Sequence, residues 1–224
     1  MPRRARAIEA GTIYHVLNRG NGRLRLFHKE QDYAAFEKIL GQAIERYPVD
    51  LLSYCLMPNH WHLVLRPRTD EALSRLMGWI GVTHVRRHHQ HYQHSAGGHL
   101  YQGRFKNFPV QDDFHFLTVC RYVEGNALRS KLVSSAERWA WGSLHARLKR
   151  NKPLKLCEWP VERPRGWTAT VNELLDRTKL VELRASVNRG RPFGDENWVR
   201  KTAKRLGLEF TVRPLGRPRK KVKE

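Results

Sequence analysis

The spacing of hydrophobic residues along the chain predicts a mixed order of strands and helices over about the first 126 residues. Apolar residues recur at helical spacing in three segments, and short strand-forming runs bounded by turn residues lie between those segments. In order, the expected elements are a strand at 12–18, a helix at 30–47, strands at 49–57 and 60–66, a helix at 71–92, a strand at 104–110 and a helix from 112 or 113 to about 126. The first six elements match a split β-α-β sheet, so we expect an α+β fold of the ferredoxin-like type.

Turn and capping residues support two of these boundaries. Only Pro58-Asn59 separates the second strand from the third, which favours a tight hairpin. Asp112 or Asp113 can cap the third helix, because a carboxylate accepts hydrogen bonds from the free N–H groups of a first helical turn.

A change of composition after about residue 150 predicts a second unit. Prolines at positions 153, 160 and 164 interrupt the chain, and a short helix is expected to begin near Asp195. Between Arg200 and Glu224 there are ten lysines and arginines but two acidic residues. We therefore expect a domain over residues 1–150, followed by a helical, basic extension over residues 151–224 that is partly flexible.

The charge of the chain narrows the class of partner. There are 42 lysines and arginines against 21 aspartates and glutamates, which gives a formal net charge of +21 at pH 7. Such a surplus repels itself in the folded state, so it favours a polyanionic partner, and nucleic acid fits better than a membrane. The N-terminal residues lack the apolar stretch of a signal peptide, and the three scattered cysteines favour a reducing cytoplasm.

A pair of histidines separated by one residue is the first candidate for chemistry. His60 and His62 fall in an expected strand, where alternate side chains share a face, so both imidazoles can point at one cation. Trp61, Leu63 and Leu65 define the opposite, core-facing side. Taken alone, such a pair is more often exposed or hydrogen-bonded than metal-bound, because metal sites need further ligands.

The segment around Tyr122 supplies further groups. In a helix, Tyr122 and Asn126 lie about one turn apart on the same face. The Asn126 carbonyl oxygen is a neutral candidate metal ligand, and the Tyr122 phenol is a candidate nucleophile. A divalent metal could help the phenol to attack a phosphodiester. Each residue also has an ordinary structural interpretation, as a core tyrosine and as a residue at a helix end.

Four ordered motifs resemble those of one known family. They are Tyr14-His15-Val16 with Asn18-Arg19-Gly20-Asn21, Met57-Pro58-Asn59-His60-Trp61-His62-Leu63-Val64, Gly98-His99-Leu100-Tyr101-Gln102-Gly103-Arg104-Phe105-Lys106, and Arg121-Tyr122-Val123-Glu124-Gly125-Asn126-Ala127-Leu128. Over about residues 8–148 the chain resembles the single-tyrosine HUH transposases related to the IS200 insertion sequences, and more narrowly the REP-associated tyrosine transposases. Ala127 departs from this pattern, since many relatives carry proline there, and the departure puts the continuation of the helix in doubt.

The resemblance implies a function and a site. It implies an HUH-type nuclease fold, with His60 and His62 as metal ligands, Asn126 as a third ligand and Tyr122 as the nucleophile. It also implies Mg²⁺ or Mn²⁺ as the cofactor and single-stranded DNA with hairpins as the partner. The activity expected from it is that of an endonuclease and strand transferase that cleaves near hairpins through a covalent 5′-phosphotyrosine intermediate.

Several basic residues are expected to contact the DNA. Arg104 and Lys106 flank an aromatic residue, as phosphate contacts combined with base stacking require, although an edge strand with solvated charges fits equally well. Two Gly-Arg-Pro sequences can place an arginine in a narrow minor groove, and the first of them can also be a turn before the helix near Asp195. The expected DNA-contacting residues are Arg19, Arg104, Lys106, Arg191, Arg217 and Arg219.

Other interpretations remain open at this stage. The histidine-rich end of the helix at 71–92 includes the i,i+4 pair His84 and His88, which could bind zinc, but a solvated or phosphate-facing helix end is favoured because no carboxylate or thiolate accompanies the pair. The alternative function is a non-catalytic protein that keeps the fold and binds hairpins or single-stranded DNA. A monomer and a homodimer are equally compatible with the sequence, and a location in the cytoplasm at the nucleoid is expected.

Overall fold

The computed structural model describes residues 8–92, 98–149, 154–173 and 175–213. The strands are β1 (Ile13–Arg19), β2 (Val49–Met57), β3 (His60–Pro67) and β4 (Lys106–Val110). The helices are α1 (Glu30–Arg46), α2 (Ala72–Tyr92), α3 (Phe114–Glu124), α4 (Asn126–Arg129), α5 (Ser143–Leu148), α6 (Trp167–Asn172), α7 (Arg177–Arg189), α8 (Glu196–Arg205) and α9 (Glu209–Val212), with short 3-10 turns η1 (Asn21–Arg23) and η2 (Ala136–Arg138). None of the helices in these described segments combines the length and the hydropathy needed to cross a membrane.

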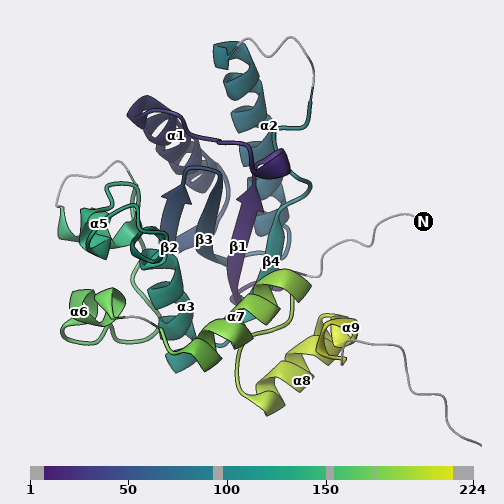
Figure 1. The fold of residues 1–224 in the computed structure, drawn as a ribbon. Helices are drawn as coiled ribbons and strands as arrows, with labels where there is room; N and C mark the ends of the chain where they lie inside the picture. Colours follow the sequence, from purple (N-terminus) through teal and green to yellow (C-terminus); the bar gives the residue numbers. More distant parts are fainter. Residues whose placement is uncertain (1–7, 93–97, 150–153, 174, 214–224) are drawn as a thin grey trace, which may run out of the picture.

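The strands form one sheet in the order β2-β3-β1-β4, with every neighbouring pair antiparallel (Figure 1). This order follows from the chain path, because each helix returns the chain across the sheet and the short turn after Met57 pairs β2 with β3 as a hairpin. The predicted α+β, ferredoxin-like fold is confirmed, and the predicted strand and helix ranges of the first 110 residues agree with the structure to within about two residues.

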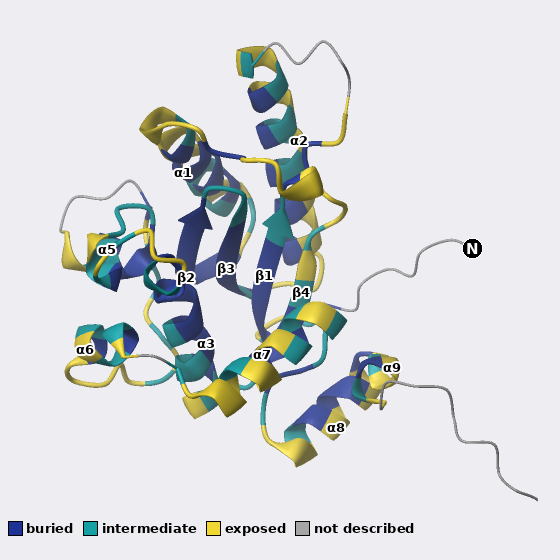
Figure 2. Ribbon diagram, viewed as in Figure 1, coloured by how far each residue is buried: buried dark blue, intermediate teal, exposed yellow. Residues whose placement is uncertain are grey.

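Helices cover the sheet on both faces. Helices α1 and α2 pack together over the face that carries Tyr14, Val16 and Trp61. Helix α3 covers the opposite face, which carries Ile13, Val64 and the two candidate histidines. Figure 2 shows the strands buried between helices whose outer faces are exposed. Trp61 faces the core as predicted, and the face with the histidines is a second buried interface.

The predicted third helix is shorter than expected. Asp113 is its N-cap, because its side chain accepts a hydrogen bond from the His115 N–H at 2.8 Å. The helix ends at Glu124, and a separate short helix, α4, begins at Asn126. The break falls at Gly125, where an added Cβ would lie only 3.3 Å from the carbonyl oxygen of Val171. The predicted end of the helix at about residue 126 agrees with the structure to within two residues, and the chain continues after Gly125 as the separate short helix α4.

Several of the described residues after position 153 pack against the same sheet. Trp167, Val171 and Leu183 belong to the second core, under α3. Phe193 pairs in parallel with Val110 at the edge of the sheet, where the Phe193 N–H donates to Pro109 at 2.9 Å. The predicted helix near Asp195 is confirmed as α8, which this residue caps. The expected domain boundary at 150/151 lies outside the described residues, so the division into two units stays a prediction.

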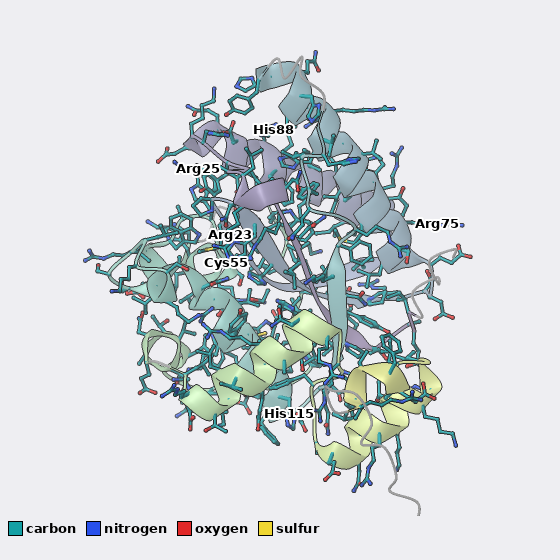
Figure 3. The ribbon with its side chains drawn as sticks, turned by 45° about the vertical axis from the view of Figure 1, so that its right-hand side comes forward. Arg23, Arg25, Cys55, Arg75, His88 and His115 are labelled. Carbon is teal, nitrogen blue, oxygen red and sulfur yellow. The ribbon has the colours of Figure 1, made fainter. Side chains whose placement is uncertain are left out.

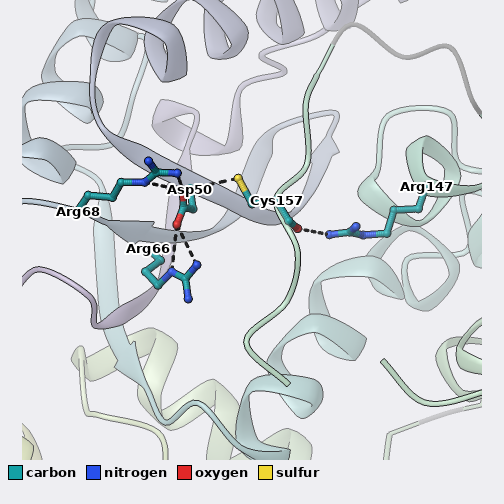
Figure 4. A network of polar contacts seen from close by, with 5 residues as sticks. All are labelled: Asp50, Arg66, Arg68, Arg147 and Cys157. Atoms are coloured by element: carbon teal, nitrogen blue, oxygen red, sulfur yellow. Dashed lines mark hydrogen bonds and ion pairs between the residues drawn. The ribbon is translucent and has the colours of Figure 1, made fainter. Parts of the chain in front are cut away.

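A buried carboxylate holds the far ends of β2 and β3 together (Figure 4). Asp50 accepts two hydrogen bonds from Arg66, at 3.0 and 3.1 Å, and two from Arg68, at 2.6 and 2.9 Å. The thiol of Cys157 donates to the same carboxylate at 3.6 Å, which ties the C-terminal residues to the sheet. Burial alone would raise the pKa of Asp50, but the hydrogen bonds and charges of Arg68 and Arg66 outweigh it and hold the pKa below its ordinary value.

Replacement of this carboxylate should lower stability in a pH-dependent way. We expect Asp50→Asn to lower the free energy of unfolding at pH 7 by about 1–3 kcal/mol, a value reduced by the solvent exposure of both arginines. A depressed carboxylate pKa stabilises the fold above the unfolded-state pKa, and that stabilisation is lost as the pH falls through the folded-state pKa. Urea unfolding at pH 7 and pH 3 measures the difference between wild type and variant, which should shrink at pH 3. An equal difference at both pH values would contradict this explanation.

Candidate active site

The two candidate histidines open strand β3 and face α3. The antiparallel register pairs His60 with Arg19 and His62 with Leu17. Because side chains alternate along a strand, both imidazoles lie on one face, and their ring centroids are 5.0 Å apart. His62 is buried and His60 is partly buried, so the pair lines the interior side of the sheet end.

A third histidine, which the sequence interpretation missed, orients one of them. His15 on β1 is fully buried, and its Nε2 atom lies 2.8 Å from Nδ1 of His62. His60 is held in the same way, since its Nδ1 atom lies 2.6 Å from Oδ1 of Asn59. Each candidate ligand thus uses Nδ1 within the protein, which leaves Nε2 for a ligand, as in many histidine metal sites. The available clue in the sequence was the position of His15, a polar residue between the apolar Tyr14 and Val16 of a predicted strand.

The environment keeps these imidazoles neutral. Burial, with smaller contributions from the positive charges of Arg19 and Arg129, lowers the pKa of His60 to about 4. Burial is also the main cause that places the pKa of His62 well below its ordinary value. Burial lowers the pKa of His15 to about 3. Neutral imidazole is the form that binds metals, so the pair is ready to act as a ligand near neutral pH.

Tyr122 approaches the histidines from α3. Its ring centroid lies 5.7 Å from that of His62 and 6.3 Å from that of His15, and both contacts are edge-on. The ring is 8% exposed, so Tyr122 reaches the site from within the second core. The structure therefore brings together three of the residues singled out in the sequence, from two elements that are far apart along the chain.

Arg129 is a second residue that the sequence interpretation missed. Its guanidinium carbon lies 4.2 Å from the centroid of the Tyr122 ring. One nitrogen, Nη2, donates to the carbonyl oxygen of Tyr122 at 3.0 Å and to Oδ1 of Asn126 at 2.9 Å. Arg129 thereby joins α3 to α4 across the break at Gly125. Its position seven residues after the tyrosine could not be interpreted without knowledge of that break.

Asn126 has one engaged and one unengaged polar atom. It is buried, Oδ1 accepts from Arg129, and Nδ2 has no hydrogen-bond partner among the described residues. The carbonyl oxygen keeps a second lone pair, so it can still bind a cation. The described residues contain no group of three or more His, Cys, Asp or Glu side chains that could hold a metal. Two neutral imidazoles and one amide oxygen fit a weakly held divalent cation that completes its shell with substrate or water.

The expected DNA-contacting residues occupy different parts of the molecule. Arg19 ends β1 beside His60, and Lys106 pairs with Leu17 at the start of β4, so both lie near the histidines. Arg104 is exposed in the segment before β4. Arg191 lies in the turn before Phe193 and lines a cavity together with His115. Arg217 and Arg219 lie outside the described residues.

Two histidines of the histidine-rich end of α2, His84 and His88, are buried and not solvated. Figure 3 shows His88 near one end of α2 and Arg75 near the other. His84 and His88 are each 5% exposed, and Nδ1 of His84 lies 2.7 Å from the hydroxyl of Tyr101. The favoured prediction is wrong for this pair because α1 packs over that side of α2. His91 is exposed, and His94 lies outside the described residues.

Comparison with known proteins gives the family of this chain. The family model described as "Transposase IS200 like" matches residues 10–126, more than half of the chain. The chain therefore belongs to the IS200-like transposase family, and membership implies a transposase-type nuclease of single-stranded DNA. The matched region ends at Asn126, so it includes the histidine pair and the tyrosine.

One curated protein and one solved structure are similar to this chain. A curated protein of Haemophilus influenzae, assigned provisionally as a REP-associated tyrosine transposase, is 22% identical over 125 residues, which are 51% of this chain and 69% of the relative. A solved structure of a REP-associated tyrosine transposase bound to a REP hairpin superposes with a TM-score of 0.51 at 17% identity. It covers 67% of this chain and 86% of the solved one, and at that identity the likeness supports the fold alone.

Proposed function

We propose that this chain is a metal-dependent endonuclease and strand transferase that cuts single-stranded DNA near hairpins through a covalent 5′-phosphotyrosine intermediate. The observation that carries the proposal is the approach of Tyr122 to His62, with ring centroids 5.7 Å apart, near the positive charges of Arg19 and Arg129. The Tyr122 phenol is a nucleophile, the two neutral imidazoles can hold a metal, and the two guanidinium groups attract negative charge. This combination suits attack on a phosphodiester better than attack on a neutral substrate.

The charges around the site favour a phosphate group. Burial is the main cause of the lowered pKa of His60, and the charges of Arg19 and Arg129 lower it further, so both cations lie close enough to affect it. A metal cation placed there would be repelled by these groups, and an anionic phosphodiester would restore the balance of charge. Together with the net charge of +21, this supports DNA as the substrate.

His60 and His62 would hold the metal through Nε2, with the carbonyl oxygen of Asn126 as the third protein ligand. When bound, Mg²⁺ or Mn²⁺ would polarise the phosphoryl oxygen and offset the negative charge of the transition state. Imidazole is an unusual ligand for Mg²⁺, so we expect Mn²⁺ to bind more tightly of the two.

The residues of the chain supply the nucleophile and its orientation. The phenol of Tyr122 gives up its proton as its oxygen forms a bond to phosphorus. The bond between phosphorus and the 3′ oxygen breaks, and the departing strand end takes up a proton and leaves as a 3′ hydroxyl. Arg129 fixes the ring of Tyr122 and the backbone of its helix, so the nucleophile is held in one position. Attack of a 3′ hydroxyl on the phosphotyrosine reverses the step, which rejoins a strand without ATP.

Hairpin DNA is proposed as the partner because the solved relative is described as bound to a REP hairpin. Arg19 and Lys106 would contact the strand near the cleavage point, while Arg104, Arg191, Arg217 and Arg219 would contact more distant phosphates. A monomer and a homodimer are both compatible with the proposal, and a mass measurement of the DNA complex distinguishes them.

The proposal is tested with end-labelled single-stranded DNA that carries a hairpin, mixed with the full chain and Mn²⁺. A protein-linked product on a denaturing gel, absent when EDTA is added, is the expected result. Binding without any linked product across a broad hairpin library, in both Mg²⁺ and Mn²⁺, would overturn the enzyme in favour of the non-catalytic hairpin-binding protein.

His15 should matter for metal binding although it is not itself a proposed ligand. We expect His15→Leu to weaken the apparent affinity for Mn²⁺ in the adduct assay by about 10–100-fold, because His62 loses the partner that orients its ring. His15→Gln, whose amide can reach the same Nδ1 atom, should lose less. Equal Mn²⁺ titration curves for the Leu variant and the wild type would refute this role.

A further inference from the structure

A cavity of about 710 Å³ lies on the opposite face of the sheet from the histidines, between α2 and the segment 101–105. Asn18 and Trp61 form part of its lining, and these two residues are register partners. The next pair along the same two strands is Arg19 with His60. Because side chains alternate across a sheet, adjacent residues of β1 and β3 thus serve the cavity on one face and the candidate active site on the other.

The wall formed by Trp61 and Tyr101 is rigid and largely apolar. The indole N–H of Trp61 donates to the hydroxyl of Tyr101 at 3.1 Å, and that hydroxyl also lies 2.7 Å from Nδ1 of His84. Asn18 donates through Nδ2 to the carbonyl oxygen of Gly103 at 3.3 Å, which fixes the loop above it. A preformed cavity with aromatic walls and a few polar groups is typical of a site for a small flat group.

Two glycines of α2 keep the cavity open. Gly78 and Gly81 are three residues apart, so they share a face of the helix, and both line the cavity. A Cβ added at either position would meet no atom within 4 Å. Packing therefore does not require glycine at these positions, although each glycine weakens the helix relative to alanine. What the two missing side chains provide is space in the cavity.

The rim of the cavity carries unneutralised positive charge. Arg86 from α2 and Arg104 from the loop both line it, and both are exposed. In the part of the chain that the structure describes, no carboxylate lies within ion-pair distance of either guanidinium. Phe105, which is half-buried beside them, adds an aromatic face. Cations at the rim of an aromatic cavity suit a base with its flanking phosphates.

We infer that this cavity binds one unstacked nucleobase of the single-stranded DNA, close in the strand to the phosphate that Tyr122 attacks. The strand would pass over the end of β1 and β3, with the scissile phosphate on the Arg19 and His60 side and the base on the Asn18 and Trp61 side. This inference rests on the proposed function, because the scissile phosphate is placed by it. It adds a subsite that would choose the position of cleavage relative to the hairpin.

The test combines a blocked cavity with an abasic scan of the DNA. Gly81→Leu extends a side chain into the cavity from a position where an added Cβ meets no atom within 4 Å, and Gly78→Leu does so independently. Thr83→Leu, on the same helix but away from the cavity, is the matched control. Fluorescence anisotropy gives the affinity of each variant for hairpin DNA in which single bases around the cleavage point are removed in turn, and thermal unfolding checks that each variant folds.

For the wild type, removal of one particular base should weaken binding by roughly ten- to a hundredfold, and removal of the others should have less effect. Both glycine variants should weaken binding of intact DNA by a similar factor and should no longer distinguish the abasic position, while Thr83→Leu behaves as the wild type. An unchanged abasic profile in both glycine variants, or a uniform loss at every position, would overturn the inference. Because these are binding measurements, failure of the proposed cleavage is recognised separately, by the absence of a covalent product in the wild type.

Discussion

Tyr122→Phe is expected to abolish the covalent protein–DNA product while DNA affinity changes by no more than about twofold. The variant removes one oxygen atom, the proposed nucleophile, and retains the ring that packs 4.2 Å from the guanidinium of Arg129. Loss of a nucleophile removes the covalent route entirely, and the positive groups that bind phosphate remain. A denaturing gel with labelled hairpin DNA measures the product, and fluorescence anisotropy measures the affinity.

Tyr92→Phe is a suitable control for this experiment. It also removes one hydroxyl, which donates to Asp32 at 2.5 Å at the end of α2, and it should form the product at the wild-type rate. A persistent covalent product in Tyr122→Phe would mean that another residue attacks the DNA. Loss of DNA binding together with the product would instead assign Tyr122 a structural role in the second core.

The fold was predictable from the sequence because its signals are local. The strand at His60 to Pro67 carries apolar residues on alternate positions, and α1 and α2 carry them at helical spacing. Two histidines separated by one residue in a strand must share a face, so their proximity followed from strand geometry alone. Their pairing with Tyr122 came from the resemblance to a family, since no local pattern relates β3 to α3.

The rest of the site depends on contacts between segments that no periodicity describes. His15 meets His62 because β1 lies beside β3 in a particular register, and a shift of one residue would turn His15 to the other face. Gly125 follows the end of α3, and a Cβ added there would lie 3.3 Å from the carbonyl oxygen of Val171, a residue that no local pattern relates to this helix. Sequence spacing alone therefore placed Tyr122 and Asn126 on one continuous helix, and the structure divides them.

Residues of α5 and α6 also contribute to the position of α3, the helix that carries Tyr122. Glu124, two residues after Tyr122, is buried and accepts hydrogen bonds from Ser143 at 2.5 Å and from the indole of Trp167 at 2.7 Å. Burial raises the pKa of Glu124, and these donors offset part of that effect. Helices α5 and α6 thus hold the last turn of α3, so residues beyond the matched family region support the site within it.

Arg129→Met is expected to lower the single-turnover rate of covalent product formation by about 100–1,000-fold, with less than a tenfold change in DNA affinity. The guanidinium lies over the Tyr122 ring and bridges Tyr122 to Asn126, so its loss frees both the nucleophile and a proposed metal ligand. Arg129→Lys keeps the charge but lacks the planar fork that makes both hydrogen bonds, and it should lose about 10–100-fold.

Rates measured at saturating DNA separate this positioning role from a loss of phosphate binding. Arg138→Met is the matched control, because it removes an exposed arginine whose hydrogen bond is to Ser134, outside the site, and its rate should equal that of the wild type. If Arg129 served only to attract DNA, both Arg129 variants would recover the wild-type rate at saturation, with Lys also keeping the affinity. The expected result is a rate that stays low at saturating DNA in both Arg129 variants, and lower in the Met variant than in the Lys variant. That result would support a positioning role for Arg129, which joins α3 to α4 beside Tyr122.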